Sequence, residues 1–435
     1  MRFVVKLAAS AALLTALALA GAASADGLSA VAALGKTMFF DPSLSGSGAM
    51  SCAFCHDPAN HYAPTGDAAV ERGGPNMDRP GLRAVPTLTY KSDTPAFTIG
   101  AENPTSEAGE ATPMAVAASD GQAEGNAAGA MAKLVAAMKA RQKHGSTATA
   151  EVPRGGLFWD GRADTLQDQA LGPLLSPFEM ANTGTADLAA KFRKGYGAEL
   201  AQLFGQQVLH DDAMLVDEGA FAIARFEVED ASFHPFSSKY DAFLAGKARL
   251  TPAETAGLKL FEDPKKGNCA ACHLDRPSAD GKPPMFTDYE YEALAVPRNP
   301  AIPANADPRY FDLGLCGPLR RDSVTHKGKL CGLFKTPTLR NVATRHVFFH
   351  NGIYRSLTDV VRFYALRDSD PGAIYPRGKD GRVAIYNDLP KPFWPNIDRI
   401  DAPFGRKPGD KPALSDAEIA QIVAFLNTLT DGWHP

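Results

Sequence analysis

The chain has 435 residues, of which 22% are charged, and its formal net charge is -4. A chain of this length predicts two or three domains rather than one. The small negative charge gives no electrostatic basis for binding nucleic acid or an anionic membrane surface, so we expect neither partner.

The first 25 residues have the pattern of a secretory signal peptide. Arg2 and Lys6 precede an apolar run at 7–20, and the small residues at 23–25 fit a cleavage site. A membrane anchor is the alternative, but a run of fourteen residues is short for a membrane span. We therefore expect cleavage before Asp26, export to a bacterial periplasm, and no membrane span in the mature chain.

A Cys-x-x-Cys-His motif follows the first predicted helix. The stretch LGKTMFFDP at 34–42 predicts a helix that ends at an Asp-Pro pair, and the motif consists of Cys52, Cys55 and His56. This motif is the attachment signature of c-type haem. The two thiols bond to vinyl groups of the cofactor, and the histidine reaches its iron.

Residues 97–150 are rich in Ala, Gly and Glu, and we interpret them as an inserted segment. One helix is plausible at 127–142, but the segment carries no motif that indicates chemistry.

The second half of the chain repeats the unit of the first half. GLKLFEDP at 257–264 precedes Cys269, Cys272 and His273, and a capping box at 251–254 marks the helix start. No sustained alternating pattern predicts strands, so we expect a mainly α protein with long Gly- and Pro-rich loops. The predicted domains are residues 26–245 and 246–435.

Two other interpretations of the cysteine pairs are weaker. Structural zinc pairs usually lie about 15–20 residues apart, whereas these lie more than 200 apart and each has its own histidine. A thioredoxin-like redox motif lacks the strand-helix context here.

Cys316 and Cys331 are separate from both motifs. In an oxidising compartment they predict a disulfide that closes a surface loop. A pair of free, redox-active thiols is the alternative.

A helix with an inward-facing tyrosine is predicted after residue 355. A capping box at 356–359 begins it, and Leu357, Val360, Val361 and Tyr364 fall on one face. From these residues alone, Tyr364 is either a core tyrosine with a satisfied hydroxyl or an iron ligand.

Other candidate ligands for the second iron are few. Met285 is the only methionine after His273, and it lies in a Pro-rich stretch. The other candidates are His326, His346, His350 and several tyrosines.

The last predicted helix begins at a capping box at 415–418. Its apolar face consists of Ile419, Ile422, Val423, Phe425, Leu426 and Leu429.

Five segments, in order over nearly the whole mature chain, resemble the bacterial dihaem cytochrome c peroxidases and their relatives of the MauG type. They read LGKTMFFDPSLSGSGAMSCAFCH, FWDGRADTLQDQALGPLLSPFEM, CAACH, FKTPTLRNVATRHVFFHNG and SLTDVVRFYA. The resemblance implies two cytochrome c-like haem domains packed against each other. The first haem would react with hydrogen peroxide, and the second would transfer electrons.

The resemblance also implies a ligand set. The position of Tyr364 holds a methionine ligand in the peroxidases and a tyrosine ligand in MauG-type enzymes. The implied iron ligands are therefore His56, His273 and Tyr364.

Four further residues match the family's reaction site. Glu179 matches a distal acid-base glutamate, Gln169 a distal glutamine, Pro173 a proline that shapes the pocket, and Trp159 a tryptophan between the haems. From the residues alone, Glu179 and Gln169 would be surface residues and Trp159 a core aromatic.

The first iron is expected to have an open side. Relatives that need reductive activation place a histidine ligand in the loop that corresponds to 66–83, and this loop has no histidine. His61 is too close to His56 in sequence to reach the other face, which leaves Met77 as the alternative ligand.

Calcium is a further cofactor that the resemblance suggests. The position that commonly supplies an asparagine ligand is Ala84 in this chain. Backbone carbonyls near Arg345 and Val347 remain as donors.

The implied activity is the use of hydrogen peroxide to oxidise residues of a periplasmic partner protein. The enzyme that matures methylamine dehydrogenase uses a tryptophan at the position of Gly267, so the partner differs here; Trp394 and Trp433 are the other tryptophans. The first alternative is a peroxidase that takes electrons from a small cytochrome c or a cupredoxin. The second is a dihaem electron carrier without catalysis.

Overall fold

The structure is a computed structural model that describes residues 27–101, 151–278 and 281–435. The predicted signal peptide and the predicted helix at 127–142 lie outside these residues. Within the described ranges, no helix is both long enough and apolar enough to cross a membrane.

The regular structure is mainly helical, as the sequence predicts. The α-helices are α1 (Ala30–Phe39), α2 (Cys52–Cys55), α4 (Leu166–Leu175), α5 (Thr185–Phe204), α6 (Asp212–Glu229), α7 (Lys239–Leu244), α8 (Pro252–Glu262), α9 (Leu357–Leu366), α10 (Pro371–Ile374) and α11 (Asp416–Asn427). The short 3-10 helices are η1 (Pro42–Leu44), η2 (Pro58–Asn60), η3 (Gln206–His210), η4 (Ala231–Phe233), η5 (Cys269–Ala271), η6 (Pro303–Ala306), η7 (Ser323–His326), η8 (Gly328–Leu330), η9 (Val342–Thr344) and η10 (Lys391–Asn396).

The described strands form three short antiparallel pairs. These are β1 (Arg72–Gly73) with β2 (Arg79–Pro80), β3 (Thr98–Ala101) with β4 (Glu151–Arg154), and β5 (Tyr291–Glu292) with β6 (Phe334–Lys335). The first residues of the predicted inserted segment therefore belong to a strand whose partner begins just after that segment.

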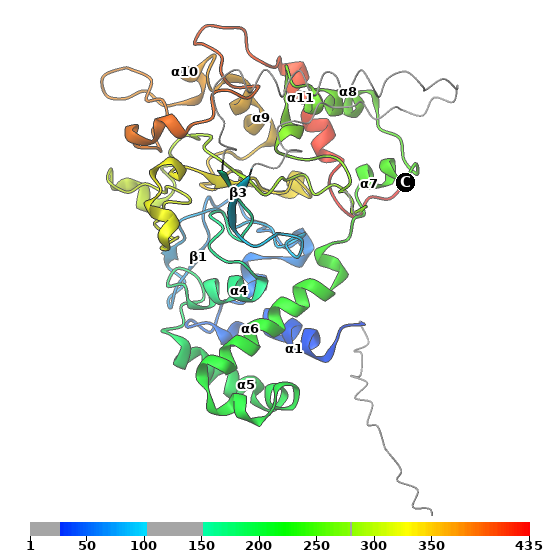
Figure 1. Cartoon of the computed structure of the whole chain (residues 1–435), viewed down its shortest axis with the longest axis vertical. Helices are drawn as coiled ribbons and strands as arrows, with labels where there is room; N and C mark the ends of the chain where they lie inside the picture. The colour runs from blue at the N-terminus through cyan, green and yellow to red at the C-terminus, as the bar shows by residue number, and fades with distance from the viewer. Residues whose placement is uncertain (1–26, 102–150, 279–280) are drawn as a thin grey trace, which may run out of the picture.

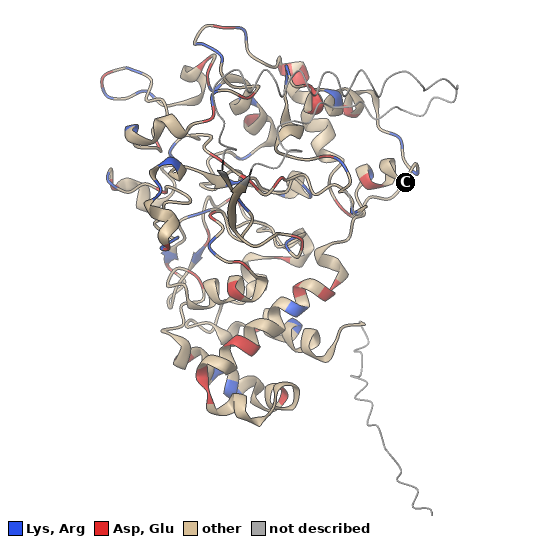
Figure 2. Ribbon diagram, viewed as in Figure 1, with Lys and Arg blue, Asp and Glu red and all other residues tan. Residues whose placement is uncertain are grey.

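Two large hydrophobic clusters lie at the two ends of the molecule. In Figure 1, α1, α4, α5 and α6 lie in the lower half, and α8, α9, α10 and α11 lie in the upper half. Buried residues between Leu28 and Phe233 make the first cluster, and those between Tyr240 and Leu429 make the second. Figure 2 shows acidic and basic residues interspersed along both groups of helices, in keeping with the small net charge.

The repeated unit forms the same helix crossing in each cluster. A Cβ atom on Gly35 of α1 would lie 1.8 Å from the carbonyl oxygen of Ala222 in α6, and one on Gly257 of α8 would lie 1.9 Å from that of Gln421 in α11. Both glycines stand six residues before the Asp of the Asp-Pro pair. Only glycine permits so close an approach of two helix backbones.

The three predicted helix starts are confirmed, and two of them have the full capping box. Capping boxes begin α8 and α11 as expected. At α9 the expected full capping box is wrong: Ser356 caps the helix, but the Asp359 carboxylate accepts from the Ser356 hydroxyl, 2.7 Å away, rather than from its backbone N–H. The capping box that begins α7 was not predicted.

Loops from both halves of the chain meet between the clusters. Arg83 donates to Asp312 through Nε at 2.6 Å and through Nη2 at 2.8 Å, and to Asp160 through Nη1 at 2.8 Å. Arg154 at the end of β4 forms an isolated bridge with Glu290. These contacts hold the loops that line the candidate site.

Candidate functional site

The first Cys-x-x-Cys-His motif presents a neutral imidazole. His56 follows α2, and its Nδ1 lies 3.1 Å from the carbonyl oxygen of Tyr62. Because a carbonyl only accepts, Nδ1 carries the hydrogen and Nε2 keeps its lone pair. Burial lowers the pKa of His56 to about 4, so the ring is neutral at physiological pH. A neutral imidazole oriented through its other nitrogen is the form that binds a metal.

The second motif repeats this arrangement. Cys269 begins η5, and Nδ1 of His273 lies 2.9 Å from the carbonyl oxygen of Phe286. Burial lowers the pKa of His273 to about 4 as well. Each histidine can therefore offer Nε2 to an iron.

The four cysteines of the two motifs are not joined in disulfides. Burial raises the pKa of both Cys52 and Cys269 to about 12, and it raises the pKa of Cys55 and Cys272 further. Zinc is bound by thiolates, so thiols whose pKa is raised by burial do not favour a zinc site.

A single zinc site is also excluded by position. Cys52 and Cys55 pack against the first hydrophobic cluster, whereas Cys269 packs against the second. Among the described residues, no group of three or more His, Cys, Asp or Glu side chains could hold a metal ion.

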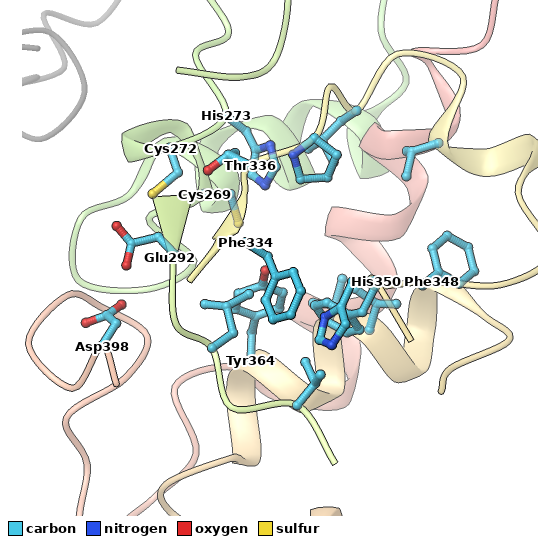
Figure 3. Close-up of a pocket in the computed structure, with 18 of the residues that line it drawn as sticks. Cys269, Cys272, His273, Glu292, Phe334, Thr336, Phe348, His350, Tyr364 and Asp398 are labelled. Carbon is cyan, nitrogen blue, oxygen red and sulfur yellow. The ribbon is translucent and has the colours of Figure 1, made fainter. Parts of the chain in front are cut away.

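A large cavity lies beside the second motif (Figure 3). His273 and Tyr364 line the same cavity, and in the view of Figure 3 they lie at its upper and lower sides with Cys269 between them. Leu357, Val360 and Val361, which share the predicted face of α9 with Tyr364, also line it. The helix face that the sequence identifies is therefore the face that α9 presents to the cavity.

Tyr364 has no hydrogen-bond partner for its hydroxyl among the described residues. Burial raises the pKa of this phenol well above its ordinary value, with smaller contributions from Cys272 and Cys269. A buried tyrosine hydroxyl usually finds a partner. The hydroxyls of Tyr289, Tyr310 and Tyr354 are also unpaired within the described structure, so the missing partner does not distinguish Tyr364. Its position in the cavity of a Cys-x-x-Cys-His motif fits a tyrosine that would be a ligand to the second iron.

The other candidate ligands lie elsewhere or are engaged. His350 lines the cavity but stacks on Phe334, with ring centroids 3.5 Å apart. His346 pairs with Asp67 at 3.1 Å, and His326 lies in η7 within the disulfide-closed loop. The disulfide itself joins Cys316 and Cys331.

Glu179 lies near the first motif. Its charge contributes to the raised pKa of both Cys52 and Cys55, and burial raises the pKa of Glu179 itself. The histidine-free loop at 66–83 packs directly against the backbone of Glu179. Gly74 N donates to the Glu179 carbonyl at 2.8 Å, and a Cβ on Gly73 would lie 2.8 Å from the Glu179 Cα. The loop thus fixes the position of this glutamate.

Gln169 and Pro173 lie one turn apart in α4, both half-buried. Because proline has no N–H, Pro173 cannot donate to the Gln169 carbonyl. The Pro173 carbonyl accepts from Met180 N at 3.1 Å, which connects α4 to the segment that carries Glu179. Met77, the alternative ligand at the first site, packs against the first hydrophobic cluster.

Trp159 lines the cavity of the second motif. Its Nε1 donates to the Ala84 carbonyl at 2.8 Å, and its own carbonyl accepts from Lys335 N at 2.9 Å. Lys91 and Arg345 line the same cavity, and both contribute to the low pKa of His56 at the first motif. The wall that carries Trp159 is therefore the wall nearest to the first motif.

The residues present do not fit calcium. Ala84 has no side-chain donor, and its carbonyl accepts the indole N–H. The next carbonyl, that of Val85, accepts from Arg345 Nη2 at 3.1 Å. A guanidinium therefore lies beside the position that supplies the asparagine ligand in the family.

Two covalent attachment motifs on a mainly helical frame, each with a neutral histidine, define a dihaem c-type cytochrome. The family profile described as "Di-haem cytochrome c peroxidase" matches residues 29–249. The chain belongs to this family of haem-dependent oxidoreductases, whose members hold two c-type haems.

Individual relatives agree with this assignment. The chain is 31% identical to the methylamine utilization protein MauG of Paracoccus denitrificans (strain Pd 1222) over 414 residues, which cover 92% of this chain and 89% of that protein. It is 28% identical to the cytochrome c551 peroxidase of Nitrosomonas europaea, with 63% and 61% covered. The crystal structure of the diheme peroxidase BthA from Burkholderia thailandensis E264 superposes with a TM-score of 0.74 and 38% identity, covering 92% of this chain and 86% of that one.

Proposed function

We propose that this protein is a periplasmic dihaem oxidoreductase that reacts with hydrogen peroxide at the iron held by His56. It shares the oxidising equivalents with a second iron held by His273 and Tyr364, and it uses them to oxidise residues of a partner protein. The observation that carries this proposal is that Tyr364 and His273 line the same cavity.

At the first site, a c-type haem with an open side supplies peroxide binding and reduction to water. The chain's contribution is the movement of a proton. The Glu179 carboxylate would move a proton from one peroxide oxygen to the other, so that the second oxygen could leave as water. Gln169 orients the bound peroxide, and Pro173 limits the space around it.

At the second site, Tyr364 would hold the iron as a phenolate. A hard anionic ligand would stabilise oxidised iron, so this site would not store a ferrous electron as a methionine-ligated site does. Trp159, in the wall nearest the first motif, carries electrons between the two sites.

The partner protein differs from methylamine dehydrogenase, whose maturation enzyme has an electron-transfer tryptophan at the position of Gly267. A Cβ on Gly267 would lie 2.5 Å from the Leu260 carbonyl oxygen and 3.3 Å from Cys269 Sγ. No larger side chain fits there without a backbone shift, so electrons from a partner enter by another route.

The second candidate is a peroxidase that reduces hydrogen peroxide with electrons from a small cytochrome c or a cupredoxin. The similarity to a cytochrome c551 peroxidase favours it. A non-catalytic electron carrier would need strong protein ligands on both sides of both irons.

The cellular location and the domain limits complete the proposal. A disulfide and four thioether-forming cysteines suit an oxidising compartment such as the periplasm. Residues 1–25 act as the signal peptide, and 26–245 and 246–435 form the two haem domains, with 97–150 inserted in the first.

The test is the addition of one equivalent of hydrogen peroxide to the fully ferric protein without a donor, followed by visible and near-infrared spectroscopy. We expect a long-lived product with a new near-infrared band, which disappears in Tyr364→Met and Tyr364→Phe. A reaction that begins only after half-reduction would refute the open first site and favour the peroxidase. Carbon monoxide binding to the reduced protein distinguishes both from an electron carrier.

A further inference from the structure

Three basic side chains line one wall of the cavity without an acidic partner. They belong to Lys91 and Arg345, which lie in loops, and to Lys335, which ends β6. The Lys335 ammonium donates to the Gly156 carbonyl, and Arg345 donates to the Val85 carbonyl. Within the described part of the chain, none of the three forms an ion pair.

The carboxylates of Asp160 and Asp312 in this region already accept hydrogen bonds from arginines. Asp160 accepts from Arg83 and Arg162, each at 2.8 Å. Asp312 accepts two bonds from Arg83. Both are paired with arginines, and Asp160 also partly offsets the lowering of the Lys335 pKa.

The three charges also act on one another. Burial, with a contribution from Arg345, lowers the pKa of Lys91 to about 8, and burial lowers that of Arg345 to about 10. Burial, then Lys91, lowers the pKa of Lys335. Three basic side chains without an ion-pair partner on one wall attract negative charge, so this wall is suited to an anion that enters the cavity.

The opposite charge lies beside the attachment cysteine. The charges that raise the pKa of Cys272 come from Asp288, Glu292, Asp398 and Asp401, and Figure 3 shows Glu292 and Asp398 near Cys272. The cavity is therefore acidic at the thioether end and basic at the Trp159 end. A haem bonded through its vinyl groups carries its two carboxylates on another edge of the ring.

We propose that Lys91, Lys335 and Arg345 form the binding site for the haem carboxylates between the two motifs, and that they replace the divalent cation implied there by the family resemblance. The inference requires the two haems but neither the peroxide chemistry nor the protein partner. It predicts a protein that needs no calcium.

The first test measures the metal content of the purified holoprotein and its response to a chelator. We expect a molar ratio of calcium to protein chains far below one. EGTA treatment should change neither the haem absorbance nor the midpoint potentials. One tightly held calcium per chain, whose removal alters the spectrum, would overturn the proposal whatever the variants show.

The second test is a spectroelectrochemical titration of Lys91→Gln and Lys335→Gln, with the exposed Lys379→Gln as the matched control. Loss of a positive charge near the cofactor favours ferric iron, so the midpoint potential should fall in the two cavity variants and stay unchanged in the control. Lys91→Arg keeps the positive charge, so its midpoint potential should equal that of the wild type. The proposal would be overturned if both cavity variants had the same midpoint potential as the control. Neither test depends on peroxide turnover.

Discussion

Replacing Gly257 with alanine should destabilise the protein by about 2 kcal/mol. The new methyl group would lie 1.9 Å from the Gln421 carbonyl oxygen and 2.9 Å from Cβ of Phe425. Because the first obstacle is helix backbone, α8 and α11 must move apart, and we take the upper end of the usual overpacking cost, about 3 kcal/mol. The better helix propensity of alanine returns about 1 kcal/mol.

Urea unfolding of the holoprotein, followed by far-ultraviolet circular dichroism, measures this loss. A change of about 2 kcal/mol raises the ratio of unfolded to folded protein about 30-fold. Gly35→Ala in α1 should behave in the same way, because its Cβ would meet the Ala222 carbonyl oxygen at 1.8 Å. Gly195→Ala in α5 is the matched control, since nothing lies within 4 Å of its Cβ, and it should gain up to about 1 kcal/mol. Equal shifts at Gly257 and Gly195 would refute the reasoning.

Three other changes test the proposed roles. Glu179→Gln should slow the reaction with peroxide about 10²–10⁴-fold in stopped-flow measurements. Because burial raises the pKa of Glu179, the wild-type rate should fall as the pH drops through that raised value, and the variant should lack this fall; a parallel profile would contradict the role. Glu227 is buried, its Oε2 has no hydrogen-bond partner in the described structure, and its pKa is raised to about 8. The folded state therefore keeps a proton that the unfolded chain releases above about pH 4.3, and stability falls from there to about pH 8. Glu227→Gln should be more stable than wild type by over about 1 kcal/mol at pH 8, a difference that disappears near pH 4; equal curves would exclude the buried acid. Replacing both Cys316 and Cys331 with serine should cost about 3 kcal/mol in urea unfolding and leave the haem spectrum unchanged.

The haem attachment motifs and several helices follow directly from the sequence. The capping boxes at 251–254 and 415–418 predict helix starts that the structure confirms, because a cap depends on side chains three residues apart. The same local rule is wrong in detail at α9, where Asp359 bonds to the Ser356 hydroxyl instead. Local rules describe which groups can bond, and competing partners decide which do.

The resemblance, rather than periodicity, identified Glu179, Gln169 and Trp159 as site residues. From the residues alone, the first two would have been assigned to the surface. Their roles remain proposals that the variants above test.

The sequence by itself determined the two cofactor motifs, the repeated helix unit and the face of α9 that carries Tyr364. Each of these depends on residues a few positions apart, whose geometry is set by the local backbone. Only the tertiary structure decided that Tyr364 shares a cavity with His273, and that Lys91, Lys335 and Arg345 converge on one wall of it. No spacing in the sequence predicts such meetings, because loops far apart in the chain are brought together by the packing of the two hydrophobic clusters and by the burial of charge between them.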